Sequence, residues 1–267
     1  MINVDSYFEN IREYKFLAKH EVGQNFLIDP EASKKIVSFA ELKPTDRVLE
    51  IGPGAGSLSY FIAKEGCPSD LVDIDEGLIT KLSGDFAEEK NVHPIVGNAL
   101  KWGFSPYTKI IGNLPYYITT SLLERVLLEG ENLVRGSFMI QKEAFMRITS
   151  KIGNSDYGPL PILLSYRATS KKEMTVPRTS FLPAPHVDSV VFSLSFDKTN
   201  DISPKTLYKI LNAMFLHRRK TILNNLASFL GDSSKAKETL EKAHIDPKER
   251  PENLSLSQYL SLTKELL

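Results

Sequence analysis

Short apolar runs alternate with longer segments of helical period over the first half of the chain. Runs rich in Val, Ile and Leu predict four buried strands, at residues 47–51, 71–75, 93–96 and 109–111. A polar or glycine-bearing loop follows each run, and helical segments separate the runs. This alternation predicts an α/β fold with a doubly wound, mostly parallel sheet, in which all four loops open on one edge.

The hydrophobic pattern changes in the second half of the chain. It predicts a fifth strand at residues 137–141 and a helix at 141–149. Two late strands, antiparallel to each other, are predicted at 166–176 and 189–196. Residues 197–203 are polar and predict a linker. After this linker, the hydrophobic positions repeat with the period of an α-helix and predict helices at 206–230, 234–243 and 256–267. We therefore expect a Rossmann-like domain at 1–198 and a small all-helical domain at 199–267.

Composition narrows the class of protein. Lysine and arginine number 33 and aspartate and glutamate also 33, so any surface that binds a polyanion must be local. Cys67 is the only cysteine, which excludes disulfides, and the five histidines have no metal-ligand spacing. No apolar run is long enough to cross a bilayer and no signal peptide is evident. We expect a soluble, cytoplasmic, monomeric protein that needs neither a metal nor a membrane.

The stretch Lys109–Tyr116 carries the most specific chemistry. Its strand ends at Gly112, and the turn Asn113-Leu114-Pro115-Tyr116 follows, stiffened by proline. The Asn113 amide oxygen and a backbone carbonyl of Leu114 or Pro115 can each accept a hydrogen from the exocyclic amine of a base. The Tyr116 ring offers a stacking face, worth about 1–3 kcal/mol. This arrangement suits methyl transfer to such an amine, whereas the four residues by themselves also describe an ordinary turn.

A glycine-rich loop after the first strand predicts a nucleoside cofactor. Gly52, Gly54 and Gly56 let the backbone approach a ligand closely, at the amino end of a helix expected at 57–64. The preceding Glu50 suits a cationic ligand better than a pyrophosphate. Asp73 ends the second strand where an acceptor for ribose hydroxyls belongs.

Two other segments combine polar residues with stiff turns. In the first, Asp29 is expected to cap a helix that begins at Pro30 and runs to about residue 40. The polar pair Gln24-Asn25 precedes this helix in the sequence, and another helix is expected at 3–17. In the second, prolines stiffen residues 178–189, which would present Phe181 either to a ligand or to the core.

The strongest basic cluster is His217-Arg218-Arg219-Lys220. Residues 205–250 hold ten basic and five acidic residues. Such a local excess could bind a phosphate backbone, although basic runs are more often a solvated helix face.

Together these motifs resemble the KsgA family of small-subunit ribosomal RNA adenine dimethyltransferases, nearly end to end. The likeness rests on six segments in the family's order: G-Q-N-F-L at 23–27, E-I-G-P-G-A-G at 50–56, G-N-L-P-Y at 112–116, F-L-P-A-P-H-V-D-S at 181–189, R-R-K-T-I-L-N-N-L at 218–226 and R-P-E-N-L-S at 250–255. The resemblance implies a class I methyltransferase fold, S-adenosylmethionine as cofactor with S-adenosylhomocysteine as product, and small-subunit rRNA as partner.

The resemblance also implies roles for residues at the matching positions. Those expected at the cofactor are Gln24, Asn25, Leu27, Gly52, Gly54, Asp73, Asn98 and Asn113. Those expected at the methyl acceptor are Asn113, Leu114, Pro115 and Tyr116, with Phe181 on the other face of a flipped adenine. Arg218, Arg219 and Lys220 are expected to bind RNA.

Two positions depart from the family's pattern. Asp73 stands where the family usually has glutamate, and Asn98 stands where it usually has aspartate. A neutral Asn98 oxygen accepts a weaker hydrogen bond than a carboxylate does. We therefore expect a reduced affinity for the cofactor.

Three alternative functions are consistent with parts of the sequence. A large-subunit rRNA methyltransferase of the erythromycin-resistance type shares the fold and a similar turn, but the leucine at 114 and segments 181–189 and 218–226 favour the small subunit. A non-catalytic assembly factor of the same fold is disfavoured by the intact 113–116 turn. A nicotinamide dehydrogenase is disfavoured by the glycine spacing.

Overall fold

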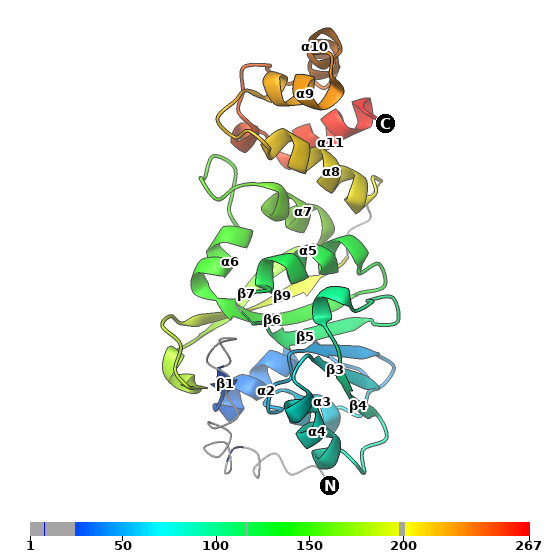
Figure 1. Cartoon of the computed structure of the whole chain (residues 1–267), viewed down its shortest axis with the longest axis vertical. Helices are drawn as coiled ribbons and strands as arrows, with labels where there is room; N and C mark the ends of the chain where they lie inside the picture. The colour runs from blue at the N-terminus through cyan, green and yellow to red at the C-terminus, as the bar shows by residue number, and fades with distance from the viewer. Residues whose placement is uncertain (1–7, 9–24, 116, 198–200) are drawn as a thin grey trace. The chain divides into compact units, whose positions relative to one another are not determined.

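The computed structural model describes residue 8 and residues 25–115, 117–197 and 201–267 (Figure 1). The chain divides into two compact units, Met1–Phe145 with Ser170–Phe196, and Met146–Thr169 with Asp197–Leu267. The helix predicted at 3–17 falls outside the described residues, except for Phe8. The domain boundary predicted at 198/199 stays a prediction, because residues 198–200 also fall outside them.

The first unit is built on a seven-stranded sheet, in the order β4-β3-β2-β5-β6-β9-β7. The strands are β2 (Val48–Ile51), β3 (Ser69–Asp73), β4 (Val92–Val96), β5 (Lys109–Asn113), β6 (Arg135–Gln141), β7 (Thr169–Val176) and β9 (Ser189–Ser195). Strands β2 to β6 run parallel to one another, and β9 pairs antiparallel with β6. The predicted doubly wound, mostly parallel α/β sheet is confirmed.

The strand order reverses beside β2, which pairs with β3 on one side and β5 on the other. In open α/β sheets this switch point opens a crevice at the carboxyl ends of the strands. Within residues 25–197, the helices of this unit are α2 (Pro30–Ser38), α3 (Ser59–Lys64), α4 (Glu76–Asp85), α5 (Thr119–Glu129) and the start of α6 (Lys142–Ile148), with the 3₁₀ turns η3 (Ala99–Lys101) and η4 (Arg178–Ser180).

Local capping sets several of these boundaries. Asp29 caps α2 as predicted, since its side chain accepts from the Ala32 N–H at 3.0 Å. The strand predicted to reach Asp75 ends at Asp73 instead, because the Asp75 side chain caps α4. The late strand predicted from 166 begins at Thr169, because α7 (Pro159–Arg167) takes up the residues before it.

A second, two-stranded sheet joins distant segments of the first unit. β1 (Phe26–Leu27) pairs antiparallel with β8 (Phe181–Leu182), with Leu27 opposite Phe181. The Ser180 hydroxyl donates to Asp29 Oδ2 at 3.2 Å, and the Ile28 N–H donates to the Ser180 carbonyl at 2.8 Å. Two motifs far apart in the chain therefore form one structural element.

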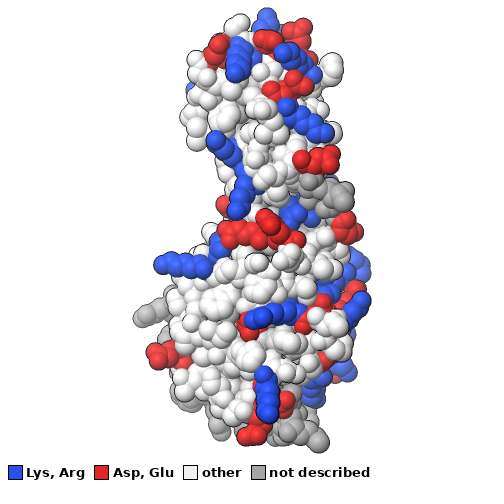
Figure 2. All heavy atoms as spheres, turned by 90° about the vertical axis from the view of Figure 1, so that its right-hand side faces the viewer, with Lys and Arg blue, Asp and Glu red and all other residues white. Residues whose placement is uncertain are grey.

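Charged side chains of both signs are interspersed on the face shown in Figure 2, on each of the two units. This distribution agrees with the balanced formal charge of the chain. Because the chain has no net charge, a strongly basic surface elsewhere on it must be local.

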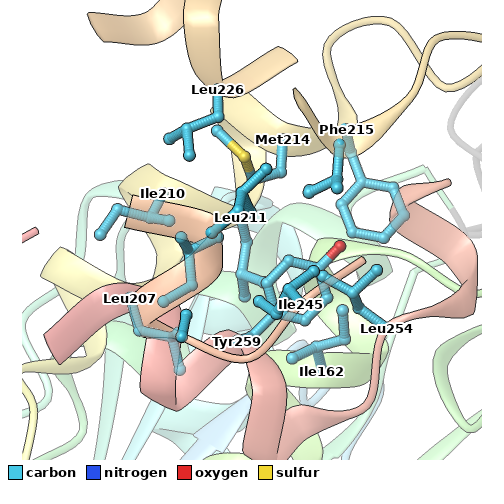
Figure 3. Packing of buried hydrophobic residues seen from close by; sticks show 14 of the residues in the cluster. Ile162, Leu207, Ile210, Leu211, Met214, Phe215, Leu226, Ile245, Leu254 and Tyr259 are labelled. Atoms are coloured by element: carbon cyan, nitrogen blue, oxygen red, sulfur yellow. The ribbon is translucent and has the colours of Figure 1, made fainter. Parts of the chain in front are cut away.

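The second unit is helical, and its core includes residues from α7, α8 and α11 (Figure 3). Its later elements are α8 (Pro204–Phe215), α9 (Ile222–Leu230), α10 (Ser233–Lys242), η5 (Pro251–Asn253) and α11 (Leu256–Glu265). The single helix predicted at 206–230 is wrong, because a turn at 216–221 separates α8 from α9. Thr221 starts the new helix by accepting from the Asn224 N–H through its side chain.

Candidate active site

A cavity of about 260 Å³ lies at the carboxyl ends of the central strands. The loops that follow β2, β3, β4 and β5 line it, together with the segment around β1. The residues predicted from sequence that line it are Asn25, Leu27, Gly52, Gly54, Asp73, Asn98, Asn113, Leu114 and Pro115. The structure thus brings the predicted cofactor segments and the predicted acceptor turn around one cavity.

The glycine-rich loop after β2 has a backbone that only glycine adopts without strain. Gly54 has a φ of +57°, and a Cβ there would lie 3.4 Å from the Phe26 ring of β1. The Gly54 N–H donates to Asp73 Oδ2 at 3.3 Å, and the Asp75 N–H donates to Asp73 Oδ1 at 3.0 Å. Asp73 therefore holds the loop against the end of β3 as well as facing the cavity.

Glu50 is a buried acid on the cavity wall, with 1% of its surface exposed. The Ser59 hydroxyl donates to its Oε2 at 2.7 Å. The pKa of Glu50 is raised from its ordinary 4.5 to about 8, chiefly by burial and to a smaller extent by the charge of Asp73, while the hydrogen bond from Ser59 lowers it. The pKa of Asp73 is also raised, chiefly by burial. Two acids with raised pKa values face one cavity, which is typical of a functional site.

The acceptor turn packs directly against this loop. A Cβ placed on Gly52 would lie 3.5 Å from Cδ of Pro115. At Gly112 no side chain fits, because its Cβ would lie 2.9 Å from the Ile51 carbonyl oxygen and 2.7 Å from Cδ2 of Leu114. Strand β5 therefore passes close to β2 just before Asn113.

The structure distinguishes the two carbonyls that the sequence left open. The Pro115 carbonyl already accepts from the Ile118 N–H at 3.2 Å and from the Thr119 hydroxyl at 3.0 Å. The Leu114 N–H donates to the Met139 carbonyl at 3.0 Å, but the Leu114 carbonyl accepts no hydrogen bond from the described residues. Leu114 therefore offers the available backbone acceptor. Tyr116 lies outside the described residues.

Asn98 is already engaged at the cavity edge. Its Oδ1 accepts from the Leu100 N–H at 2.9 Å and so caps η3. A carbonyl oxygen has a second lone pair, so the same atom can still accept from a ligand.

Phe181 does not line the cavity. It is 3% exposed and belongs to the apolar core that includes Leu27 and Val176. Its predicted stacking on a base stays a prediction, and it requires the ring to leave this position. Gln24, also predicted at the cofactor, lies outside the described residues.

Tyr117 was missed by the sequence reasoning, although it lines the cavity with 64% of its surface exposed. The doubled tyrosine at 116–117 was the signal for it. Ile74, at the end of β3, is a second exposed apolar residue on the cavity lining.

The three basic residues predicted to bind RNA lie in the second unit and differ from one another. Nη2 of Arg218 donates to the Tyr157 carbonyl at 3.0 Å, and its guanidinium lies 5.8 Å from the centre of the Phe215 ring. The Arg219 and Lys220 side chains are exposed and form no hydrogen bond or ion pair with the described part of the chain.

Comparison with known proteins identifies the family. The profile described as "Ribosomal RNA adenine dimethylase" matches residues 15–267. The chain belongs to this family. "Ribosomal RNA small subunit methyltransferase A" of Bacillus cytotoxicus is 38% identical over 96% of this chain and 94% of its own length. The protein of the same name from Alkaliphilus metalliredigens is 36% identical over 96% of this chain and 94% of its own.

Solved structures agree with the fold. A dimethyladenosine transferase from Plasmodium falciparum superposes with a TM-score of 0.75 at 25% identity, covering 88% of this chain and 94% of that one. The 23S rRNA methyltransferase ErmE superposes with a TM-score of 0.67 at 23% identity, covering 90% and 99%, which supports the fold alone. The class I methyltransferase fold expected from the sequence motifs is confirmed.

The cavity fits S-adenosylmethionine, the cofactor of this family. Gly52 and Gly54 line the cavity without side chains, so a ligand can approach the backbone of this loop closely. Asp73 is a carboxylate acceptor suited to ribose hydroxyls, and Glu50 is an acid suited to a cation. Within the described ranges, no group of His, Cys, Asp or Glu could hold a metal and no helix could span a membrane.

Proposed function

We propose that this chain dimethylates the exocyclic amines of two adjacent adenines in a 3′-terminal hairpin loop of small-subunit (16S) rRNA, using S-adenosylmethionine. Membership of the family makes it an rRNA adenine N6-dimethyltransferase. The observation that supports the proposed site is the contact between the loop after β2 and the acceptor turn, where the Cβ position of Gly52 lies 3.5 Å from Pro115. The choice of the small subunit is supported by the small-subunit methyltransferases to which the chain is 36–38% identical.

The acceptor turn would make the amine reactive by hydrogen bonding. An adenine amine is a poor nucleophile because its lone pair is delocalised into the ring. Hydrogen bonds from the amine to Asn113 Oδ1 and to the Leu114 carbonyl would favour a pyramidal nitrogen with a directed lone pair. Pro115 is excluded from this role because its carbonyl already has two donors. The contribution of these residues is positioning, and no strong base is needed.

The loops on the other side of the cavity would hold the cofactor. Bound S-adenosylmethionine supplies a methyl group on a positively charged sulfur. Asp73 would accept from its ribose, Asn98 from its adenine amine, and Glu50 would favour its positive charge. Each transfer joins the methyl carbon to the amine nitrogen and releases a proton and S-adenosylhomocysteine.

Recognition of RNA is assigned to the second unit. Arg219 and Lys220 are exposed cations with no acidic residue between positions 202 and 231. They would bind phosphates, and Arg218 would support the backbone that carries them. Acting on rRNA before the subunit is complete, the chain would take part in small-subunit biogenesis, as a monomer in the cytoplasm.

The test is methyl transfer from labelled S-adenosylmethionine to small ribosomal subunits from cells that lack this modification. Large subunits, an Asn113→Ala variant and an Asn132→Ala variant are assayed in parallel. Asn132 is a matched control because it is an exposed asparagine that donates to the Ser105 carbonyl. Mass spectrometry identifies the modified nucleosides.

We expect dimethyladenosine in small-subunit RNA only, lost in Asn113→Ala and retained in Asn132→Ala. Methylation confined to large subunits would overturn the proposed substrate. Full activity of Asn113→Ala would overturn the proposed acceptor site. If the chain bound small subunits but did not methylate them, the result would favour a non-catalytic assembly factor over an enzyme.

A further inference from the structure

The turn between α8 and α9 is built around one buried amide. Asn225, on α9, has 1% of its surface exposed, although its side chain is polar. Its Oδ1 accepts from the His217 N–H, and its Nδ2 donates to the carbonyls of His217 and Thr221, each at 3.2 Å. Asn225 therefore holds both ends of the segment His217–Thr221.

Further contacts fix the same turn. The Lys220 N–H donates to the His217 carbonyl at 2.9 Å, and the Arg218 guanidinium bonds the Tyr157 carbonyl. Phe215 precedes the turn and Leu226 follows it, and both side chains lie in the core of the second unit (Figure 3). The backbone of the turn is thus held from inside while the side chains of Arg219 and Lys220 remain exposed.

The arrangement exceeds what a helix start requires. Thr221 already caps α9 through its own side chain, so the three bonds of Asn225 serve the turn instead. A flexible basic loop loses backbone freedom when it binds phosphates, and this loss weakens binding. A turn fixed beforehand avoids that loss.

We propose that Asn225 is a positioning residue that preorganises the basic turn His217–Lys220 for the phosphate backbone of rRNA. This inference rests on the proposed binding of RNA by Arg219 and Lys220. Asn225 itself is buried, so it acts through the turn and does not touch the nucleic acid.

The test compares Asn225→Ala with Asn224→Ala, its exposed neighbour, whose side chain forms no hydrogen bond with the described residues. The probe is the unmethylated small ribosomal subunit. Its dissociation constant is measured at several salt concentrations, together with KM for the subunit, KM for S-adenosylmethionine, and kcat. Amide hydrogen exchange of residues 217–221 reports the order of the turn.

For Asn225→Ala we expect about tenfold weaker binding and about tenfold higher KM for the subunit, because all three bonds that order the turn are lost and the turn must then be ordered on binding. The kcat and the KM for S-adenosylmethionine should not change, and amide exchange in the turn should quicken. The slope of log K against log salt should stay the same, because the cations remain. Asn224→Ala should match the parent protein.

Two further variants separate positioning from general stability. Asn225→Asp keeps an oxygen that can accept from the His217 N–H, but it loses the two hydrogen bonds that Nδ2 donates. It takes the place of Asn225→Ala in the test if the alanine variant does not fold. Leu262→Val trims a buried core residue of the same unit, away from the turn in sequence. Weakening of RNA binding by Leu262→Val to the same extent as by the Asn225 variants would overturn the inference, as would unchanged binding in both Asn225 variants.

Variants of the exposed cations distinguish this inference from the proposed function. Arg219→Ala and Lys220→Ala should each weaken binding and lower the salt slope by about 1 if each side chain binds a phosphate. If neither variant weakens binding and lowers the salt slope, the assignment of RNA binding to this turn is wrong. If both do so and the Asn225 variants bind normally, only the positioning role fails.

Discussion

The Ser59 hydroxyl donates to the Oε2 of Glu50 at 2.7 Å, on the wall of the cavity. The Glu50 side chain is buried, and its pKa is raised to about 8. A hydroxyl can bond either form of the carboxyl group, because it both donates and accepts. The pair therefore allows Glu50 to exist as an acid in the free protein and as a carboxylate beside a cation.

Glu50 should make stability fall as pH rises. Its pKa is higher in the folded chain than in the unfolded chain, so the folded state binds more protons between about pH 4.5 and 8. Its contribution to stability is complete below pH 4.5 and is lost as pH rises through 8. Glu50→Gln should flatten this part of the profile, as measured by urea unfolding at a series of pH values. An identical slope in both proteins would contradict the prediction.

Cofactor binding should depend on pH in the opposite direction. A cation in the cavity favours ionised Glu50, so binding S-adenosylmethionine should release protons near pH 7, and its affinity should rise from pH 6 to pH 8. S-adenosylhomocysteine lacks the sulfonium charge and should show a smaller dependence. Calorimetry in buffers of different ionisation enthalpy measures the released protons. Undiminished proton release in Glu50→Gln would rule out this residue as the source.

Replacing Asn98 by the family's usual aspartate should tighten cofactor binding. A charged acceptor contributes about 1.5–3 kcal/mol against about 1 for a neutral one, so we expect an affinity several-fold higher for Asn98→Asp. The cap of η3 should survive, because aspartate and asparagine cap equally well. Titration with S-adenosylmethionine tests this, with Asn224→Asp as a control for added charge. An unchanged dissociation constant for Asn98→Asp would contradict it.

Gly54→Ala should weaken cofactor binding as well as stability. An alanine at a φ of +57° costs about 1–2 kcal/mol, and its Cβ would lie in ordinary contact with Phe26; a backbone shift that relieves the strain would change the cavity wall that Gly54 lines. Gly153→Ala is the matched control, since Gly153 has a φ of +80° and open space where a Cβ would stand. We expect both variants to lose similar stability, with reduced affinity for S-adenosylmethionine in Gly54→Ala alone. Equal affinities would show that the loop does not bound the cofactor site.

Asp29 and Ser180 should be coupled energetically. Asp29 caps α2 through one carboxylate oxygen and accepts from Ser180 through the other. Asp29→Ala should cost about 1–2 kcal/mol because it loses both bonds, and Ser180→Ala should cost about 1. A double-mutant cycle by chemical denaturation should give a coupling of about 0.5–1 kcal/mol. Strict additivity would mean that this bond does not hold β1 to β8.

The sequence by itself determined the kind of fold and which residues gather at the candidate site. The period of the hydrophobic residues distinguishes strands from helices, and the loops after parallel strands lie at one edge of the sheet. The sequence therefore predicted that Gly52, Asp73, Asn98 and Asn113 lie at the same edge. Local chemistry also determined the α2 start at Asp29 and Pro30. These features depend on neighbours within a few residues, which the sequence displays directly.

The tertiary structure decided what depends on distant contacts. The choice of the Leu114 carbonyl over that of Pro115 follows from the bonds that Ile118 and Thr119 make when α5 begins. The burial of Phe181 follows from the pairing of β8 with β1. The break between α8 and α9 follows from three bonds of Asn225 inside a packed core. Side-chain period cannot reveal such bonds, because they form only after the segments have been brought together.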